Sequence, residues 1–304
     1  LAPQAYLRIT SIGISDPTGY VISVVLILFS VLSLGVASRA TSGRDYATVQ
    51  RGGGGLSKRP MTKGHAVLAY GIIGLILLLV LSPHIGLLLL SFATIWSYSP
   101  LPDAYTLHHY GRVLTESWHF VANTLLYAAL AGLIDVVIGT AIAYLVLRTK
   151  IHGRIWLDYL ASAALAVPGV VLGIGYLRAY YGVTLPDGKS VTSFWFIIVI
   201  ALAVRRLPYA LRACVAAMQQ ISVSLEEAAE NLGATKARTI RRIVVPLMTG
   251  GIVAGFVTSF ATAAVELSAT MMLVQNTSDA PLAYGLYVFM QSPAGRGAGA
   301  ALGV

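Results

Sequence analysis

The stretch AVLAYGIIGLILLLVLSPHIGLLLLSF, residues 66–92, contains no Asp, Glu, Lys or Arg. About 20 apolar residues are enough for an α-helix to cross a bilayer. The stretch therefore predicts a membrane-spanning helix that is long enough to tilt, with a kink expected at Pro83.

Similar apolar runs lie along the rest of the chain, at 20–37, 122–147, 157–177, 193–213 and 246–264. Hydrophobic residues make up 57% of the 304 residues, and charged residues only 11%. A soluble domain has roughly 25% charged residues, and disordered chains are richer still in charge. The composition excludes both classes and predicts an all-α fold, a polytopic transmembrane helical bundle. The single cysteine, Cys214, excludes a disulfide within the chain.

Basic residues alternate between rich and poor segments. Sixteen of the 21 lie in 38–65, 148–156 and 205–245, which are therefore expected to be cytoplasmic. Residues 1–19 and the C-terminal stretch are then expected outside. The N-terminus is a poor signal peptide because residues 1–19 contain Asp16, Pro17 and only one basic residue. The net charge of +9 fits basic membrane loops, so no nucleic-acid partner is expected.

The two ends of the sequence resemble each other. Residues 2–6 (APQAY) match residues 280–284 (APLAY) at an offset of 278, which is either chance or a tandem of two similar modules. On the tandem interpretation, residues 1–37 are the last span of a preceding module. Residues 38–65, with four consecutive glycines, are a cytoplasmic linker, and 66–304 are a second module whose final span is truncated.

Residues 222–246, SVSLEEAAENLGATKARTIRRIVVP, carry the most informative local pattern. Ser224 and Glu227 have the spacing of a capping box, which predicts a short helix from Leu225 to Leu232. Gly233 is suited to end that helix in the left-handed conformation. A second helix, capped by Thr235, is expected to follow.

The short helix has a small apolar face on one side and polar residues on the other. The apolar face consists of Leu225, Ala228, Ala229 and Leu232. The residues directed away from it are Glu226, Glu227, Glu230 and Asn231. A shallow apolar face on a cytoplasmic helix suits docking into a groove on a partner.

The pattern Glu227-Ala228-Ala229, followed by Gly233, Ile243 and Pro246, resembles the signature loop of inner-membrane permeases of binding-protein-dependent ABC importers. Val245 departs from the leucine that is usual before the proline. The resemblance covers the chain from about residue 66 to its end.

This resemblance implies a type I ABC importer permease fold and a multi-pass protein of the bacterial inner membrane. It implies a cytoplasmic ABC ATPase dimer, a periplasmic substrate-binding protein and a second permease module as partners. The short helix would be the coupling helix within the loop 222–246. With its apolar face included, the expected ATPase-docking residues are Leu225, Glu226, Glu227, Ala228, Ala229, Leu232 and Gly233.

The chain itself is not expected to be an enzyme or to hold a cofactor. The nearest candidate for an ATP-binding loop, Gly188-Lys189-Ser190, has Val183 where the motif needs glycine, and it lies on the predicted outer side. ATP and Mg would therefore bind to the partner ATPase. The histidines His108, His109 and His119 lack the spacing of a metal site, and no catalytic residue set is present.

Several polar residues fall within predicted spans. Asp135 is expected either to serve a pathway or helix interface or to be merely tolerated in protonated form. The run 193–204 is too short to span a bilayer, so its helix must continue through Arg205 and Arg206. These arginines are expected to snorkel to the interface, the alternative being an ion pair or a pathway role. Candidate translocation-path residues are Asp135, Arg205, Arg206, Glu266 and Ser268.

Other polar and small residues favour contacts between spans. The polar stripe Thr258, Ser259, Thr262, Glu266, Ser268 and Thr270 could line a path or join helices. The pairs Gly169/Gly173 and Gly251/Gly255 predict close helix packing.

The substrate is open at this stage. The stretch RRLPYALRA, residues 205–213, resembles a helix of ferric-iron importers, and thiamine, aminophosphonate and polyamine are alternatives. A secondary transporter is a second class of hypothesis, but it would not need the docking loop. A membrane enzyme is a third, and it lacks a catalytic set.

Overall fold

The structure is a computed structural model that describes residues 21, 24–29, 31, 32, 36, 62–96, 99–291 and 293–304. Its contacts divide the chain into two units. One contains residues 118–285 with the N-terminal 35 residues, and the other contains 36–117 with 286–304. Within the described ranges the regular structure is helical, apart from isolated bridges between Ala93 and Tyr105 and between Thr184 and Ser190.

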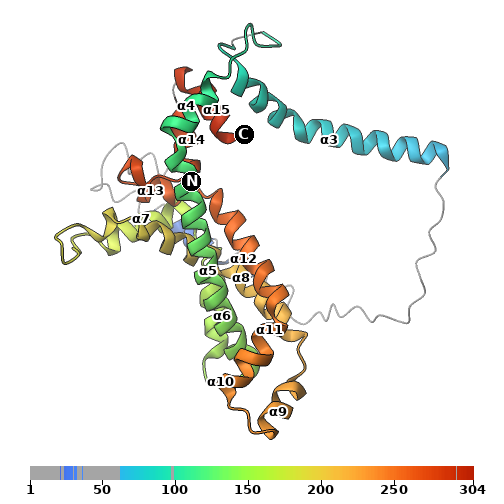
Figure 1. Ribbon diagram of the computed structural model, residues 1–304. Helices are drawn as coiled ribbons and strands as arrows, with labels where there is room; N and C mark the ends of the chain where they lie inside the picture. The colour runs from blue at the N-terminus through green and yellow to red at the C-terminus, as the bar shows by residue number, and fades with distance from the viewer. Residues whose placement is uncertain are drawn as a thin grey trace. The chain divides into compact units, whose positions relative to one another are not determined.

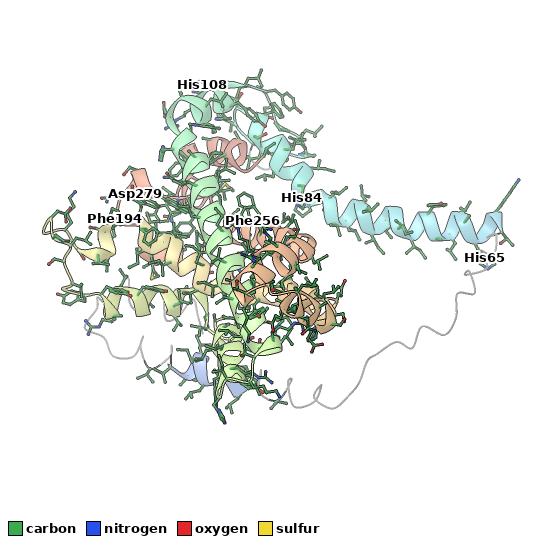
Figure 2. All side chains as sticks on the ribbon, turned by 60° about the horizontal axis from the view of Figure 1, so that its bottom comes forward. His65, His84, His108, Phe194, Phe256 and Asp279 are labelled. Atoms are coloured by element: carbon green, nitrogen blue, oxygen red, sulfur yellow. The ribbon has the colours of Figure 1, made fainter. Side chains whose placement is uncertain are left out.

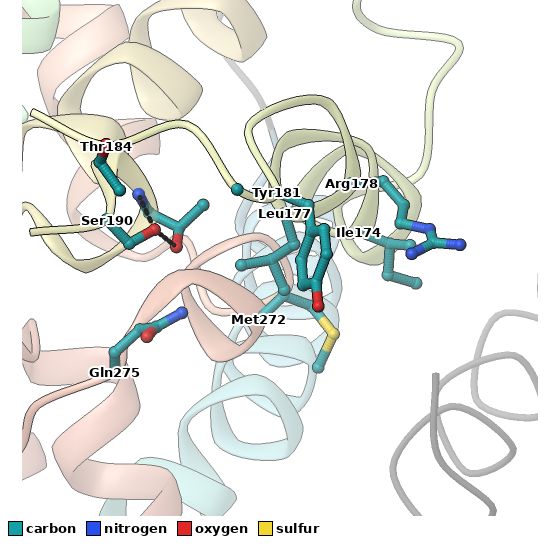
Figure 3. Close-up of a pocket in the computed structure, with 10 residues that line it drawn as sticks. Ile174, Leu177, Arg178, Tyr181, Thr184, Ser190, Met272 and Gln275 are labelled. Atoms are coloured by element: carbon teal, nitrogen blue, oxygen red, sulfur yellow. Dashed lines mark hydrogen bonds between the residues drawn. The ribbon is translucent and has the colours of Figure 1, made fainter. Parts of the chain in front are cut away.

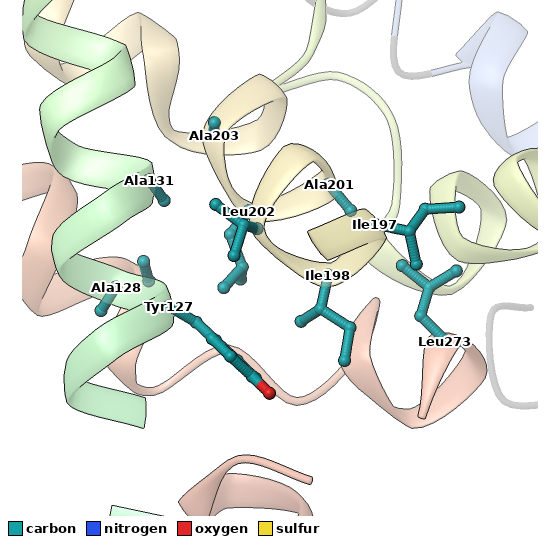
Figure 4. Packing of buried hydrophobic residues seen from close by; sticks show 11 residues of the cluster. Tyr127, Ala128, Ala131, Ile197, Ile198, Ala201, Leu202, Ala203 and Leu273 are labelled. Carbon is teal, nitrogen blue, oxygen red and sulfur yellow. The ribbon is translucent and has the colours of Figure 1, made fainter. Parts of the chain in front are cut away.

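Three long helices form the centre of the first unit (Figure 1): α5 (Trp118–Arg148), α8 (Phe196–Gln219) and α12 (Thr249–Ala264). Each packs against the other two. Tyr127 of α5 and Ile198 of α8 belong to one buried cluster, shown in Figure 4. The backbones of α5 and α8 approach closely at Gly139, where an added methyl group would lie 3.1 Å from the backbone nitrogen of Leu211.

The glycines of α12 allow close packing on α8. A methyl group at Gly251 would collide with Ala217, and one at Gly255 would lie 3.2 Å from the Cα atom of Ala210. The prediction that Gly251 and Gly255 mark a close helix contact is confirmed.

The predicted single span 157–177 is wrong. The chain instead forms α6 (Arg154–Ala163) and α7 (Gly169–Ala179) with a break between them. Pro168 directly precedes α7 and has extended backbone angles, with ψ of 140°. A proline has no backbone N–H and disfavours helical geometry before it, which accounts for the break.

The entry to α12 is also bent. The segments α10 (Lys236–Thr239), η2 (Ile240–Val244, a π-helical turn) and α11 (Val245–Leu247) lead to α12 through a bend of 68°. Pro246 lies in α11 and interrupts the hydrogen-bond ladder there. After α12 come α13 (Thr270–Leu273), η3 (Thr277–Asp279) and α14 (Leu282–Met290), and η1 (Val191–Ser193) precedes α8.

The second unit contains α3 (Lys63–Phe92), α4 (His108–Glu116), η4 (Pro293–Gly295) and α15 (Arg296–Gly303). The Ser91 hydroxyl is 2.7 Å from the Tyr110 hydroxyl, and His109 Nε2 is 3.0 Å from the Ala93 carbonyl. His109 thus has a structural partner, and no group of metal-binding side chains occurs among the described residues. Helix α3 is continuous through Pro83, and its side chains project on all sides between His65 and His84 in Figure 2.

Length and composition identify α3 and α5 as helices that could cross a membrane, and the bent pair ending in α12 makes a third candidate if counted as one span. Helix α8 ends at Gln219, so the expected continuation through Arg205 and Arg206 is confirmed. Ten of the 18 residues of the predicted span 20–37 are described, and they are helical, whereas the predicted linker 38–65 lies outside the described residues up to residue 61.

Candidate functional site: the α9 segment and the buried charges

Helix α9 (Val223–Asn231) lies at one end of the α5–α8–α12 group (Figure 1). Its end is as predicted: Gly233 has a φ of +84°, and its N–H donates to the Glu230 carbonyl. The Ala234 N–H donates to the Ala229 carbonyl, which completes a Schellman motif. A turn of this kind fixes where the helix stops and where the chain goes next.

The predicted start of this helix is wrong by two residues. Ser222, rather than Ser224, is the N-cap, and its hydroxyl accepts the Ser224 N–H at 3.4 Å. Glu227 consequently does not form the predicted capping box. Thr235 caps α10 as predicted, because its hydroxyl accepts the Arg238 N–H at 3.4 Å.

The expected division of α9 into two faces is wrong for two residues. Glu226 was expected to point away from the apolar face, but it is buried and pairs with Arg148. Ala229 was expected at the centre of a free face, but it too is buried, with 8% exposure. The other residues of α9 are exposed, namely Val223, Ser224, Leu225, Glu227, Ala228, Glu230 and Asn231, and so is Leu232, which follows the helix.

Arg148 holds α9 through bonds to three groups. Its Nε donates to Glu226 Oε1 at 2.6 Å, and its Nη2 donates to the carbonyls of Met218 and Ile221 at 3.1 and 2.6 Å. Sequence reasoning missed this role because Arg148 lies 78 residues from Glu226 and no local pattern connects them.

A second charged cluster lies within the helical group. Glu266 Oε2 accepts from Arg205 Nε at 3.0 Å and from Arg206 Nη2. The Glu266 side chain is 4% exposed, against 20% and 11% for the two arginines. The expectation that these arginines snorkel is therefore wrong, because a buried carboxylate pairs with them inside the protein. The alternative of a structural ion pair is confirmed.

This Arg205–Glu266–Arg206 cluster also bonds the irregular backbone at two helix breaks. Arg205 Nη1 donates to the Val167 carbonyl at 2.8 Å, in the break between α6 and α7. Glu266 Oε1 accepts the Ala269 N–H at 3.2 Å, just before α13. Carbonyl and amide groups freed by a helix break need such partners in a membrane.

Gly169 and Ser268 lie beside this cluster. A methyl group at Gly169 would lie 2.7 Å from the Ser268 Cβ atom and 3.0 Å from Glu266 Oε1. The expected candidates Glu266, Ser268, Arg205 and Arg206 are therefore brought together. Gly169, for which the sequence predicts only close packing, is their neighbour.

Asp135 makes a separate contact, between α5 and α12. Its side chain is fully buried, and its Oδ2 accepts from the Ser259 hydroxyl of α12. This arrangement fits the interface role among the alternatives for Asp135. Thr258 and Thr262 donate to carbonyls of their own helix, at 2.7 and 2.8 Å.

A hollow of about 560 Å³ lies between the end of α7, the loop that follows it and α13 (Figure 3). Tyr181 and Met272 lie on one side, and Thr184, Ser190 and Gln275 on the other. The lining has no acidic residue. On the predicted topology, this hollow lies toward the outer side.

Comparison with known proteins establishes the family. Residues 135–290, just over half of the chain, match the family described as binding-protein-dependent transport system inner membrane component. The chain belongs to this family. The resemblance stated from residues 227–246 is confirmed, as is a multi-pass location in the inner membrane.

Relatives with curated descriptions include two ferric permeases. The ferric transport system permease protein of Actinobacillus pleuropneumoniae is 27% identical over 289 residues, which cover 93% of this chain and 41% of the relative. A putative ferric transport system permease protein of Haemophilus influenzae is 27% identical over 279 residues, 90% of this chain and 43% of the relative. The chain thus spans about two-fifths of the length of these ferric relatives.

A shorter relative and a solved structure agree with the family. The molybdenum transport system permease protein of Escherichia coli K12 is 34% identical over 202 residues, 62% of this chain and 87% of the relative. A crystal structure of a bacterial alginate ABC transporter, in complex with an alginate pentasaccharide-bound periplasmic protein, matches with a TM-score of 0.60 at 18% identity. The match covers 79% of this chain and 86% of that one. The predicted all-α fold of an ABC importer permease is confirmed.

Proposed function

We propose that this permease is the transmembrane part of an ATP-driven importer and that it docks a cytoplasmic ABC ATPase through α9. The observation that carries the proposal is a short, sharply terminated helix that is held at the end of the bundle through Glu226 and Ala229, with its other side chains exposed. Closure of an ATPase dimer would move α9, and α9 would move the membrane helices.

The proposed contact is one exposed side of α9, formed by Leu225, Ala228 and Leu232. Leu232 is 89% exposed and Leu225 is 46% exposed. Apolar side chains this exposed on a short helix suit a groove on a partner protein. Glu226, Ala229 and Gly233 then fix the position and end of α9 rather than touch the ATPase.

The other proposed partners follow from the family and the alignments. An external binding protein would deliver the substrate, and ATP and Mg would be bound by the ATPase, since the loop at 188–190 does not match an ATP-binding motif. Ferric relatives more than twice as long align with over nine-tenths of this chain, whereas the molybdenum relative matches 62% of it. This supports the tandem: residues 1–37 from one module, a linker at 38–65, and a second module at 66–304.

Ferric iron is the proposed substrate. The ferric alignments extend over 93% and 90% of this chain, so they take in part of the region before residue 66. Molybdate is the second candidate because the molybdenum permease is 34% identical, a higher value over a shorter stretch. The residues proposed to line the translocation path are Asp135, Arg205, Arg206, Glu266 and Ser268. They would face the path when the helices rearrange.

The docking experiment is quantitative co-purification of the ATPase with the full-length permease. Ala228→Glu places a long charged side chain on the exposed side and should reduce ATPase recovery about tenfold, as expected for a clash in a small interface. Glu230→Gln changes the opposite side of the same helix without adding bulk and serves as the control. Normal ATPase recovery with Ala228→Glu would exclude this side of α9 as the docking surface.

The transport experiment uses proteoliposomes with the permease, the ATPase and the binding protein. Uptake of radioactive iron should require internal ATP, and molybdate should not compete. Uptake without ATP would support the secondary-transporter hypothesis, and competition by molybdate would favour the second substrate.

A further inference from the structure

The carboxyl end of α5 is joined to α9 through one side chain. Arg148 is the last residue of α5, and its guanidinium bonds the Glu226 carboxylate and two backbone carbonyls. Both charged side chains are only 10% exposed. The contact is therefore shielded from water on all but a small part of its surface.

The two carbonyls belong to the end of α8 and the connection that follows it. Met218 is in the last turn of α8, and Ile221 directly precedes the N-cap of α9. The last carbonyls of a helix have no partner within the helix and carry partial negative charge. The Arg148 guanidinium bonds these two carbonyls and the carboxylate of Glu226 in the first turn of α9. It therefore joins the ends of α5 and α8 to α9.

This contact is better suited to set a position than to add stability. Burial of two charges costs free energy that their mutual attraction offsets only with good geometry, so such pairs contribute little net stability. The planar guanidinium fixes direction as well as charge, which a lysine ammonium does not. Within the part of the chain that the structure describes, no comparable ion pair holds the far end of α9, where Leu232 is 89% exposed.

We propose that Arg148 is a positioning residue that makes α9 move as one body with the carboxyl ends of α5 and α8. The proposal rests on the function proposed for α9. Without Arg148, the exposed side of α9 would still bind the ATPase, but rotation of α9 would no longer be transmitted to α5. ATP hydrolysis would then continue without driving transport, so the two activities would be uncoupled.

The first measurement does not depend on the ATPase. Spin labels at His152 and Glu230, both exposed, report the distance between the turn after α5 and α9 in the full-length permease, with Cys214 replaced. Arg148→Met should broaden the distance distribution, and Arg148→Lys should broaden it less. An unchanged distribution in Arg148→Met would overturn the proposal.

The second measurement is the number of substrates transported per ATP in proteoliposomes. Arg148→Met and Glu226→Gln should retain ATPase co-purification while this ratio falls about tenfold, the order expected for loss of a charge-assisted bond. The control is Lys150→Met, which removes an exposed positive charge two residues away and should change neither readout. An unchanged ratio in both variants, or an equal fall in Lys150→Met, would refute the positioning role.

A double variant separates positioning from charge. Arg148→Glu with Glu226→Arg can restore the ion pair, but a carboxylate at 148 cannot donate to the carbonyls of Met218 and Ile221. Partial recovery of the ratio is therefore expected. A different outcome would be a low yield of folded permease for Arg148→Met together with an unchanged number of substrates per ATP for Glu226→Gln. Arg148 would then be needed only for folding. Failure of the unaltered permease to bind the ATPase would contradict the proposed function and leave the spin-label result standing.

Discussion

Two charged clusters of the first unit use arginine in the same way at different places. At the end of the bundle, one arginine bonds one carboxylate and two carbonyls. Among the helices, two arginines share Glu266, and one of them bonds the carbonyl of Val167. Both clusters satisfy backbone groups that helix ends leave open.

The difference is in charge balance and burial. The Arg148–Glu226 pair is balanced and joins helix ends, whereas Glu266 is 4% exposed and faces two cations. Loss of Glu226 would leave one cation with two carbonyl partners. Loss of Glu266 would leave two cations enclosed near each other at two helix breaks. We therefore infer that the Glu266 cluster determines whether the unit folds, and the Glu226 pair determines how α9 is held.

The largest expected effect tests this difference directly. Glu266→Gln should destabilise the permease by about 3–5 kcal/mol, because removing one partner leaves buried charge uncompensated. Thermal unfolding in detergent, followed by size-exclusion chromatography, measures the loss. Glu226→Gln should be clearly milder. Equal destabilisation by the two variants would remove the distinction between the clusters.

A surface control calibrates that comparison. Arg112 and Glu116 form an ion pair at 2.9 Å on α4, with side chains 44% and 63% exposed. Glu116→Gln should change stability by about 0.5 kcal/mol or less, since exposed pairs contribute little.

The next effect concerns the backbone at the α6–α7 break. Arg205→Lys retains a positive charge, but one ammonium cannot reproduce the two directed bonds from Nε and Nη1. We expect a loss of about 1–3 kcal/mol, with faster proteolysis near residues 164–168. Unchanged stability and cleavage would show that the Val167 carbonyl does not depend on Arg205.

The sequence predicted features that a few consecutive residues determine. Gly233 and Thr235 were identified correctly because a glycine in the left-handed region and a hydroxyl N-cap act within one turn of helix. Neighbouring residues alone do not decide whether Ser222 or Ser224 is the N-cap of α9. The distant residue Arg148 also bonds the carbonyl of Ile221, just before the helix starts.

The contacts between predicted spans were harder to predict for a related reason. Arg205 and Glu266 were both noted as polar residues within predicted spans, but they lie 61 residues apart. A hydropathy scale assigns an arginine in a span an unfavourable transfer free energy. It contains no information about which carboxylate pairs with that arginine. The break at Pro168 was similarly hidden, since apolar composition alone does not distinguish one span from two shorter helices.

A smaller effect tests the packing of α12 on α8. Gly251→Ala should cost about 1–3 kcal/mol because the added methyl meets Ala217 on α8. Its neighbour Gly250 has no atom within 4 Å of an added methyl. Gly250→Ala should therefore be neutral or stabilising by up to about 1 kcal/mol, through helix propensity. Thermal unfolding of the two variants side by side checks the difference.

The smallest effect is expected at Asp135, which belongs to neither cluster. Asn at 135 retains an oxygen that can accept the Ser259 hydroxyl bond, and it fits the same volume. Asp135→Asn should thus change stability by about 1 kcal/mol or less, the usual range for a single neutral hydrogen bond, and leave ATPase co-purification intact. Asp135→Leu removes the acceptor and should cost more, about 1–3 kcal/mol, since the buried Ser259 hydroxyl loses its partner. If Asp135→Asn retained stability and ATPase binding but abolished uptake, the carboxylate would have a pathway role, and this third polar site would join the Glu266 cluster as part of the transport machinery.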